Sequence, residues 1–177
     1  MALFDFMKKK SNAKKEYLLR WQNVVMPEKG NKLLVTEEQL RATTQYIAAN
    51  DLRIMNDCIN IIQSTLKPDT FFMRLNLLAD KAKRLAVLEQ YISFSGASPS
   101  SAYNEVVENY QEAIKEFLIR YFSETFDKAE AMKTEKGRIG KYQKFYDSLQ
   151  EYYPYMDDKN KEFIETKHKA YTRNQRG

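Results

Sequence analysis

Four glutamates, at positions 105, 108, 112 and 116, recur at intervals of three or four residues. In a helix this spacing places their carboxylates in one narrow stripe, opposite the aromatic positions of the same segment. Such a stripe can hold Mg²⁺ if a second acidic helix faces it, bind a basic partner, or simply face solvent. Like charges four residues apart repel each other, which favours a solvated surface first and a basic partner second. We take Glu105, Glu108 and Glu112 as candidate partner-binding residues.

Few residues in the chain are suited to catalysis. It has one cysteine, Cys58, and one histidine, His168, which cannot supply the paired ligands of di-iron or zinc sites. Cys58 lies in an apolar helical stretch, where burial raises the pKa of a thiol and makes it unreactive. The segment GRIGK at 137–141 lacks the spacing of a phosphate-binding loop. We therefore expect no cofactor, no metal and no enzymatic activity. The one type of catalysis that these residues still allow is chemistry at a Mg²⁺ ion bound by carboxylates alone.

Basic and aromatic residues alternate between positions 138 and 155. Aromatic rings next to Lys and Arg are typical of proteins that bind single-stranded nucleic acid. The helical spacing of the large residues from 142 to 152 favours a buried core instead. Tyr153 and Tyr155 are left as candidate partner-binding residues. The candidate nucleic-acid-binding residues are the cations of this region and of the C-terminal end: Arg138, Lys141, Lys144, Lys167, Lys169, Arg173 and Arg176.

The chain opens with MALFDFMKKK, in which Leu3, Phe4 and Phe6 are further candidate partner-binding residues. Burying one large apolar side chain contributes roughly 1.5–3 kcal/mol, and each lysine near an anionic bilayer adds about 1 kcal/mol. The segment is about two turns long, which is short for an interfacial helix. We favour docking onto the body of the protein or onto a neighbouring subunit. Contact with a membrane surface and plain disorder are the alternatives.

The composition indicates one soluble, helical domain. The 177 residues include only five glycines and four prolines, so turns are few and elements long. The net charge of +5 is concentrated at both ends, which suits a polyanionic partner or simply keeps the chain soluble. No apolar run is long enough to span a membrane, and the lysines follow the first apolar run rather than precede it. With a single cysteine, this predicts a cytoplasmic protein.

The predicted fold is all-α, a single-domain bundle of about six helices with long central ones. We expect a flexible basic segment with an apolar tip over 1–13, a helical domain over 14–172 and a frayed basic tail over 173–177. Thr36 with Gln39, Pro68, and Asp157 or Asp158 are expected helix starts, and Gly137 with Gly140 an expected turn. The expected helices are 14–23, 36–50 and 51–66 (or a single helix over both), 69–93, 99–133, one carrying residues 142–152, and one through Tyr171.

These features predict a non-catalytic helical adaptor or assembly module that binds another protein or itself. The first alternative is a nucleic-acid-binding accessory protein of a bacterial or mobile genome, which would use the basic ends. The second is peripheral association with a membrane surface through residues 1–10.

Overall fold

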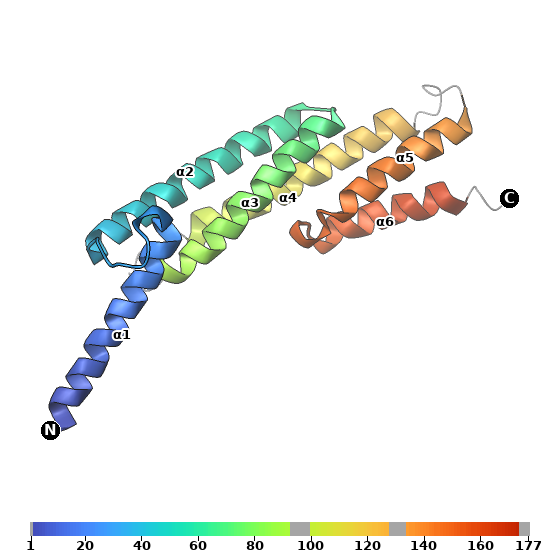
Figure 1. The fold of residues 1–177 in the computed structure, drawn as a ribbon. Coiled ribbons are helices and arrows are strands. Elements are labelled where there is room, and N and C mark those ends of the chain that lie inside the picture. The colour runs from blue at the N-terminus through green and yellow to red at the C-terminus, as the bar shows by residue number, and fades with distance from the viewer. Residues whose placement is uncertain (1, 93–99, 128–133, 174–177) are drawn as a thin grey trace. The chain divides into compact units, whose positions relative to one another are not determined.

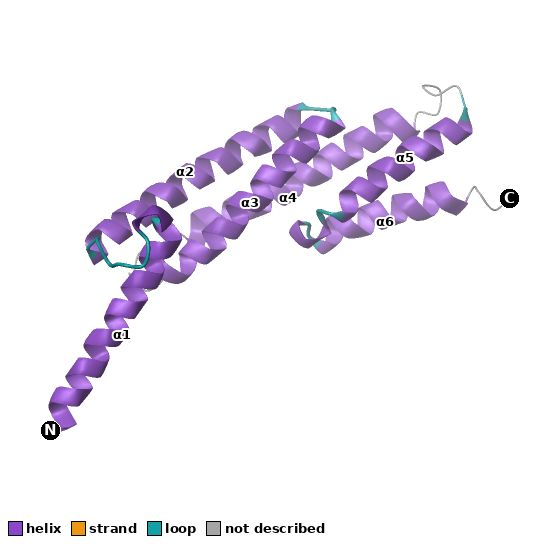
Figure 2. Cartoon of the chain, viewed as in Figure 1, coloured by secondary structure: helices purple, strands orange, loops and turns teal. Residues whose placement is uncertain are grey.

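The computed structural model describes residues 2–92, 100–127 and 134–173, and the side chains of 10–91, 104–127 and 134–172. Within these residues the chain is all-α, as predicted, and contains no strand (Figures 1 and 2). The α-helices are α1 (Ala2–Val25), α2 (Glu37–Ser64), α3 (Pro68–Ile92), α4 (Ser100–Phe122), α5 (Glu135–Gln150) and α6 (Asp158–Arg173). Shorter helical segments are η1 (Pro27–Lys29), η3 (Ser123–Asp127) and η5 (Tyr153–Tyr155). None of the described helices is long and apolar enough to cross a membrane.

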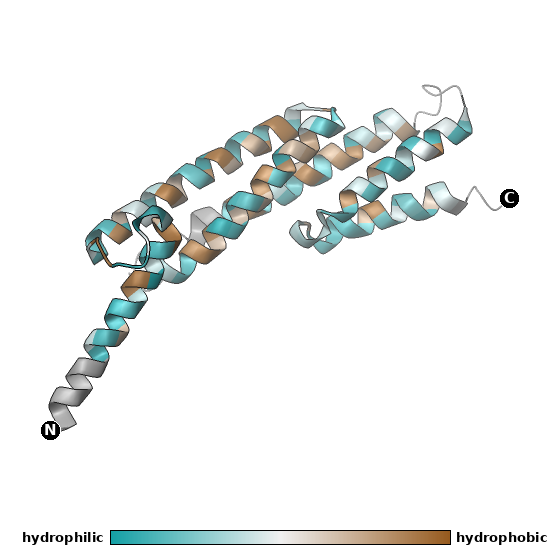
Figure 3. Ribbon diagram, viewed as in Figure 1, coloured by the Kyte–Doolittle hydropathy of each residue, from teal (hydrophilic) through white to brown (hydrophobic). Residues whose placement is uncertain are grey.

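The chain forms two compact units, which we describe separately. Unit 1 comprises Met1–Arg53 and Ala82–Ser101, and unit 2 comprises Ile54–Lys81 and Ala102–Gly177. The helices α2 and α3 therefore each contribute one part to either unit. Figure 3 shows apolar and polar residues interspersed along both helices, as expected for helices with one buried face.

Three predicted helix starts are confirmed. Before α2, the N–H of Gln39 donates to Thr36 Oγ1 at 3.2 Å and the N–H of Thr36 donates to Gln39 Oε1 at 2.9 Å, a reciprocal capping box. Pro68 is the first residue of α3, a position whose N–H has no partner within the helix, so the lack of an N–H in proline costs no hydrogen bond. Before α6, Asp157 Oδ1 accepts from the N–H of Asn160 at 2.8 Å. Side chains thus satisfy the otherwise unpaired N–H groups at two of these starts.

Three predicted boundaries were wrong. Residues 2–13 of the segment 1–13, which was expected to be flexible, are part of α1, which begins at Ala2. The helix expected over 99–133 ends at Phe122 and continues as the π-helical η3, and residues 128–133 lie outside the described part. Gly137 and Gly140 do not form a turn but lie in α5, because Thr134 Oγ1 caps that helix by accepting from the N–H of Gly137. The loop expected after Ser93 and the tail after Arg173 also fall outside the described residues.

The core of unit 1 is built around Trp21 near the end of α1. Its indole N–H donates to Thr44 Oγ1 on α2 at 2.8 Å, and its ring stacks on Tyr91 of α3 at 5.8 Å between centroids. Gln22, also buried, accepts from the N–H of Leu34 and donates to the carbonyl of Lys32. Because the side-chain amide of Gln22 both donates to and accepts from backbone groups of this loop, it fixes the end of α1 to the segment that leads into α2.

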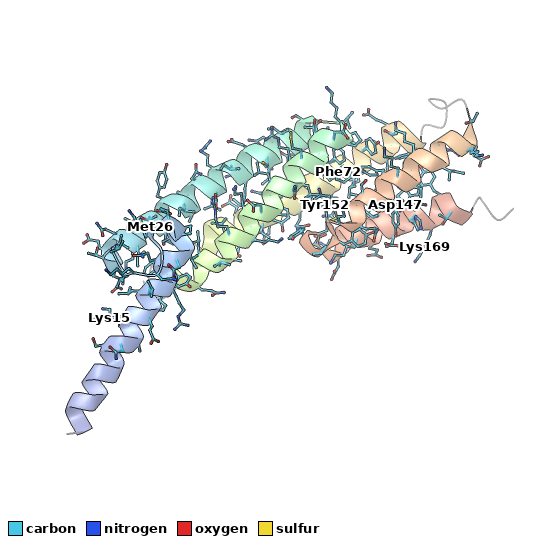
Figure 4. The ribbon with its side chains drawn as sticks, viewed as in Figure 1. Lys15, Met26, Phe72, Asp147, Tyr152 and Lys169 are labelled. Carbon is cyan, nitrogen blue, oxygen red and sulfur yellow. The ribbon has the colours of Figure 1, made fainter. Side chains whose placement is uncertain are left out.

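The core of unit 2 is largely aromatic. Phe71 of α3 and Phe117 of α4 stack with centroids 3.9 Å apart, and both are fully buried. Phe72 packs against Tyr152 at 5.6 Å, a pair labelled in Figure 4. Gln111 of α4 adds a polar connection, since its Nε2 donates to the carbonyl of Tyr155 at 2.8 Å and its Oε1 accepts from the N–H of Asp157. These contacts fix the start of α6 to α4.

Candidate partner-binding surfaces

The first surface is the N-terminal part of α1. Every residue from Lys10 to Glu16 is exposed, whereas Trp21 and Val25 farther along the helix are buried. Figure 1 shows the first turns of α1 extending away from the other helices of unit 1, and Figure 4 shows Lys15 on this part of the helix. Lys14 forms an exposed ion pair with Glu37 at 3.3 Å. The side chains of Leu3, Phe4 and Phe6 lie outside the described set, so their predicted role stays a prediction.

The net charge is distributed unequally between the units. Unit 1 contains twelve basic and seven acidic residues, and unit 2 contains seventeen of each, so the net charge of +5 belongs to unit 1. Helix α1 alone has six basic residues against two acidic ones. An exposed helix with this excess of cations attracts anionic surfaces.

The second surface is the glutamate stripe on α4. All four glutamates of the predicted stripe are exposed, which agrees with the predicted solvated face. Glu112 accepts from Lys115 at 3.1 Å and Glu116 from Gln63 at 3.2 Å. Within the described residues no group of three or more acidic, His or Cys side chains is arranged to hold a metal ion. The stripe is therefore a surface of exposed carboxylates on unit 2.

Arg120 of α4 binds backbone carbonyls at the end of α2. Its guanidinium donates to the carbonyl of Ile62 at 3.3 Å and to that of Thr65 at 3.5 Å. These carbonyls lie at the C-terminal end of α2, where backbone acceptors lack partners within the helix. A cation at this end also interacts favourably with the helix dipole.

The two candidate tyrosines are only partly available for a partner. Tyr153 is half-buried, and its hydroxyl donates to Glu165 at 2.8 Å; burial, together with this bond, raises the pKa of that hydroxyl. Tyr155 is half-buried as well. Tyr146 also donates to Glu165, at 3.0 Å, and its ring stacks on His168 at 3.9 Å between centroids. Tyr153 and Tyr146 thus both contribute to the α5–α6 hairpin through Glu165.

The thiol of Cys58 behaves as expected from the sequence. Cys58 is 1% exposed, and burial raises the pKa of its thiol. A thiol that stays protonated is a poor nucleophile and a poor metal ligand. This favours a packing role for Cys58.

The candidate nucleic-acid-binding residues have different environments. Lys141, Lys144 and Lys169 are exposed, and Arg138 is half-buried. A surface depression on α5 mixes Lys144 with two carboxylates and is lined by Gly140, Gln143, Lys144, Asp147, Ser148 and Glu151. The side chains of Arg173 and Arg176 lie outside the described set. Together with the zero net charge of unit 2, this mixed lining disfavours a phosphate-binding surface here.

Lys167 is bound within unit 2. Its Nζ contacts both carboxylate oxygens of Asp127, at 2.7 and 3.0 Å, and Tyr171 donates to the same carboxylate at 2.7 Å. Burial alone would raise the pKa of Asp127, but the hydrogen bonds from Lys167 and Tyr171 and the charge of Lys167 hold it below its ordinary value of 3.8. Lys167 therefore stabilises the fold and is less available for a polyanion.

The Lys167–Asp127 pair predicts a specific pH dependence of stability. At a pH above its ordinary pKa, a carboxyl whose pKa is lowered by folding stabilises the folded state. This contribution disappears as the pH falls through the pKa that the carboxyl has in the folded state. Lys167→Met should therefore lower the free energy of unfolding by up to about 1 kcal/mol at pH 7, since the pair is partly exposed. The loss should shrink below about pH 4. Urea unfolding at pH 7, 5 and 3 measures it, with exposed Lys169→Met as the control; a loss independent of pH would contradict the assignment.

Sequence reasoning missed an ion pair that involves a buried carboxylate. Asp51 of α2 is fully buried, and both of its carboxylate oxygens accept from the guanidinium of Arg84 on α3. The two residues are 33 positions apart, so no local pattern connects them. The only signal in the sequence is an aspartate at the start of an apolar helical stripe.

Comparison with models of protein families, with curated proteins and with solved structures finds no match for this chain.

Proposed function

We propose that this protein is a non-catalytic helical adaptor that binds a partner protein, or another copy of itself, through the N-terminal part of α1. The observation that carries the proposal is the contrast along this helix. Residues 10–16 are exposed on every side, while Trp21 and Val25 are buried in unit 1. A helix anchored at one end offers its free part to a partner without loss of internal packing.

The energetics of an exposed helix support a binding role. An isolated helix of this length is marginal in water, so a partner that buries one of its faces stabilises it. The sequence places Leu3, Phe4 and Met7 in the first turns of α1. Burial in a groove would contribute roughly 1.5–3 kcal/mol for each large apolar residue, before the entropic cost of ordering. Insertion of an amphipathic helix into a groove is a common mode of recognition.

The charge distribution supports a second candidate function, binding of a nucleic acid. The net charge of +5 lies in unit 1, so this function would use α1 rather than the cations of α5 and α6. Fluorescence anisotropy of labelled mixed-sequence DNA and RNA at two salt concentrations tests it. Binding that weakens steeply with salt supports this candidate, because released counterions dominate such binding. No binding at low salt eliminates it.

A cytoplasmic location belongs to the same proposal. The single cysteine, which is buried, suits a reducing compartment. Association with anionic vesicles through residues 1–10 remains the other alternative, and Phe4→Asp should abolish it.

Site-specific crosslinking in the source cells tests the adaptor proposal. A photoreactive amino acid at exposed Asn12 of α1 should form an adduct with a protein, and the same group at exposed Gln45 of α2 should not. Both positions belong to unit 1, so the pair separates α1 from the unit as a whole. An adduct of twice the mass of the chain identifies a second copy, and another mass identifies a different protein. Adducts equal at both positions, or none at Asn12, would refute the proposal.

A further inference from the structure

Resting on the function proposed above, we propose that the partner of α1 is a second copy of this chain, and that the lysine-rich part of α1, residues 8–15, docks onto the glutamate stripe of α4 in that copy. The two surfaces have opposite charge and are both exposed in the described residues. They belong to different units, with α1 in unit 1 and the stripe in unit 2.

The cationic surface is concentrated in one stretch of α1. Lysines at positions 8, 9, 10, 14 and 15 span about 10 Å of helix at 1.5 Å per residue. The described side chains of Lys10, Lys14 and Lys15 are exposed, and Lys14 forms an ion pair with Glu37. Lys10 and Lys14 lie four residues apart and repel each other, and carboxylates of a partner would reduce this repulsion.

The acidic surface is long enough to cover this stretch and has the opposite charge. From Glu105 to Glu116 the stripe extends about 16 Å along α4, enough to cover the lysines of α1. Glu108 and Glu112 repel each other, as do Glu112 and Glu116, which are again four residues apart. Lys115, which is half-buried, contacts the stripe by donating to the Glu112 carboxylate. Docking of α1 would relieve the repulsion on both helices.

Charge also decides which surfaces of two copies meet. Pairing of α1 with α1 brings six basic residues of one copy against six of the other, which is unfavourable. Pairing of α1 with α4 joins two different surfaces and is therefore heterologous. A heterologous contact continues as a ring or an open chain rather than ending at a symmetric pair. We expect association that grows with concentration and weakens with salt, because exposed ion pairs are screened.

Charge reversal on each side tests the pairing. The basic-side variant carries Lys10→Glu and Lys15→Glu, and the acidic-side variant carries Glu105→Lys and Glu108→Lys. Each alone should associate at least about tenfold more weakly than the natural chain. An equimolar mixture should associate again, because the natural α1 of the acidic-side variant then meets the natural α4 of the basic-side variant. Light scattering and sedimentation of the full-length chain measure association at low and high salt.

Matched controls separate this pairing from general charge effects. Lys141→Glu with Lys144→Glu reverses two exposed cations on α5 and should leave association unchanged. All substituted residues are exposed, so the far-UV circular dichroism should also stay unchanged. A natural chain that remains monomeric, or a mixture that does not associate, would overturn the inference. In that case an Asn12 adduct with a different protein would still support the adaptor function.

Discussion

Replacing Phe117 with Ala is expected to lower the free energy of unfolding by about 3–5 kcal/mol. Phe117 is fully buried in unit 2, stacks on Phe71 with an interplanar angle of 4°, and stacks on Tyr121 at 5.5 Å. Removing the ring takes away its burial and leaves a cavity between two rings. Phe71 is itself held by Phe72 at 5.3 Å, so the cavity can close only in part. Urea unfolding followed by far-UV circular dichroism measures the loss.

A matched control lies two residues farther along α4. Ile119 is 46% exposed, so Ile119→Ala removes apolar surface that the solvent already reaches. Its effect should stay within about 0.5 kcal/mol, and the higher helix propensity of Ala offsets part of it. If both substitutions cost the same, Phe117 would not be the centre of the unit 2 core.

Local patterns predicted where helices begin, because the relevant bonds join residues close in the sequence. The Thr36–Gln39 capping box joins residues three positions apart, and the bond from Asn160 to Asp157 does the same. Pro68 acts through its own ring. The burial of Tyr142, Phe145 and Leu149 follows equally from helical spacing within one segment.

Two of the three wrong boundaries resulted from overinterpretation of local patterns. The segment 1–13 was expected to be flexible because of its lysines, yet Lys and Ala are good helix formers, and no Gly or Pro interrupts the segment. Gly137 and Gly140 were expected to form a turn because glycine favours turns. The cap at Thr134 places Gly137 in the first turn of α5, where its N–H needs a partner from outside the helix.

The charge of the candidate surfaces was predictable, but their exposure was predictable only in part. The sequence shows where lysines and glutamates lie, and helical spacing correctly placed the four glutamates of α4 on an exposed face. It could not show that Lys167 is engaged by Asp127, a partner 40 residues away. It also could not show that Glu165 accepts from both Tyr146 and Tyr153. Contacts of this kind depend on tertiary packing.

Replacing Arg84 with Met is expected to lower the free energy of unfolding by about 2–4 kcal/mol. The substitution leaves the fully buried carboxylate of Asp51 without its cation. Breaking a completely buried pair costs about 3–5 kcal/mol, and the lower range applies because the Arg84 side chain is 46% exposed. Water can therefore reach the vacated position and solvate part of the carboxylate.

A double-mutant cycle separates the pair from its surroundings. Asp51→Leu combined with Arg84→Met should be more stable than Arg84→Met alone, because the double variant contains no unpaired buried charge. The coupling between the two sites should be about 0.5–3 kcal/mol. Trp21 is the single tryptophan, and both substitutions fall in its unit, so its fluorescence reports the unfolding directly. If the two substitutions were additive, the pair would contribute nothing, and apolar contacts alone would hold α2 against α3 in unit 1.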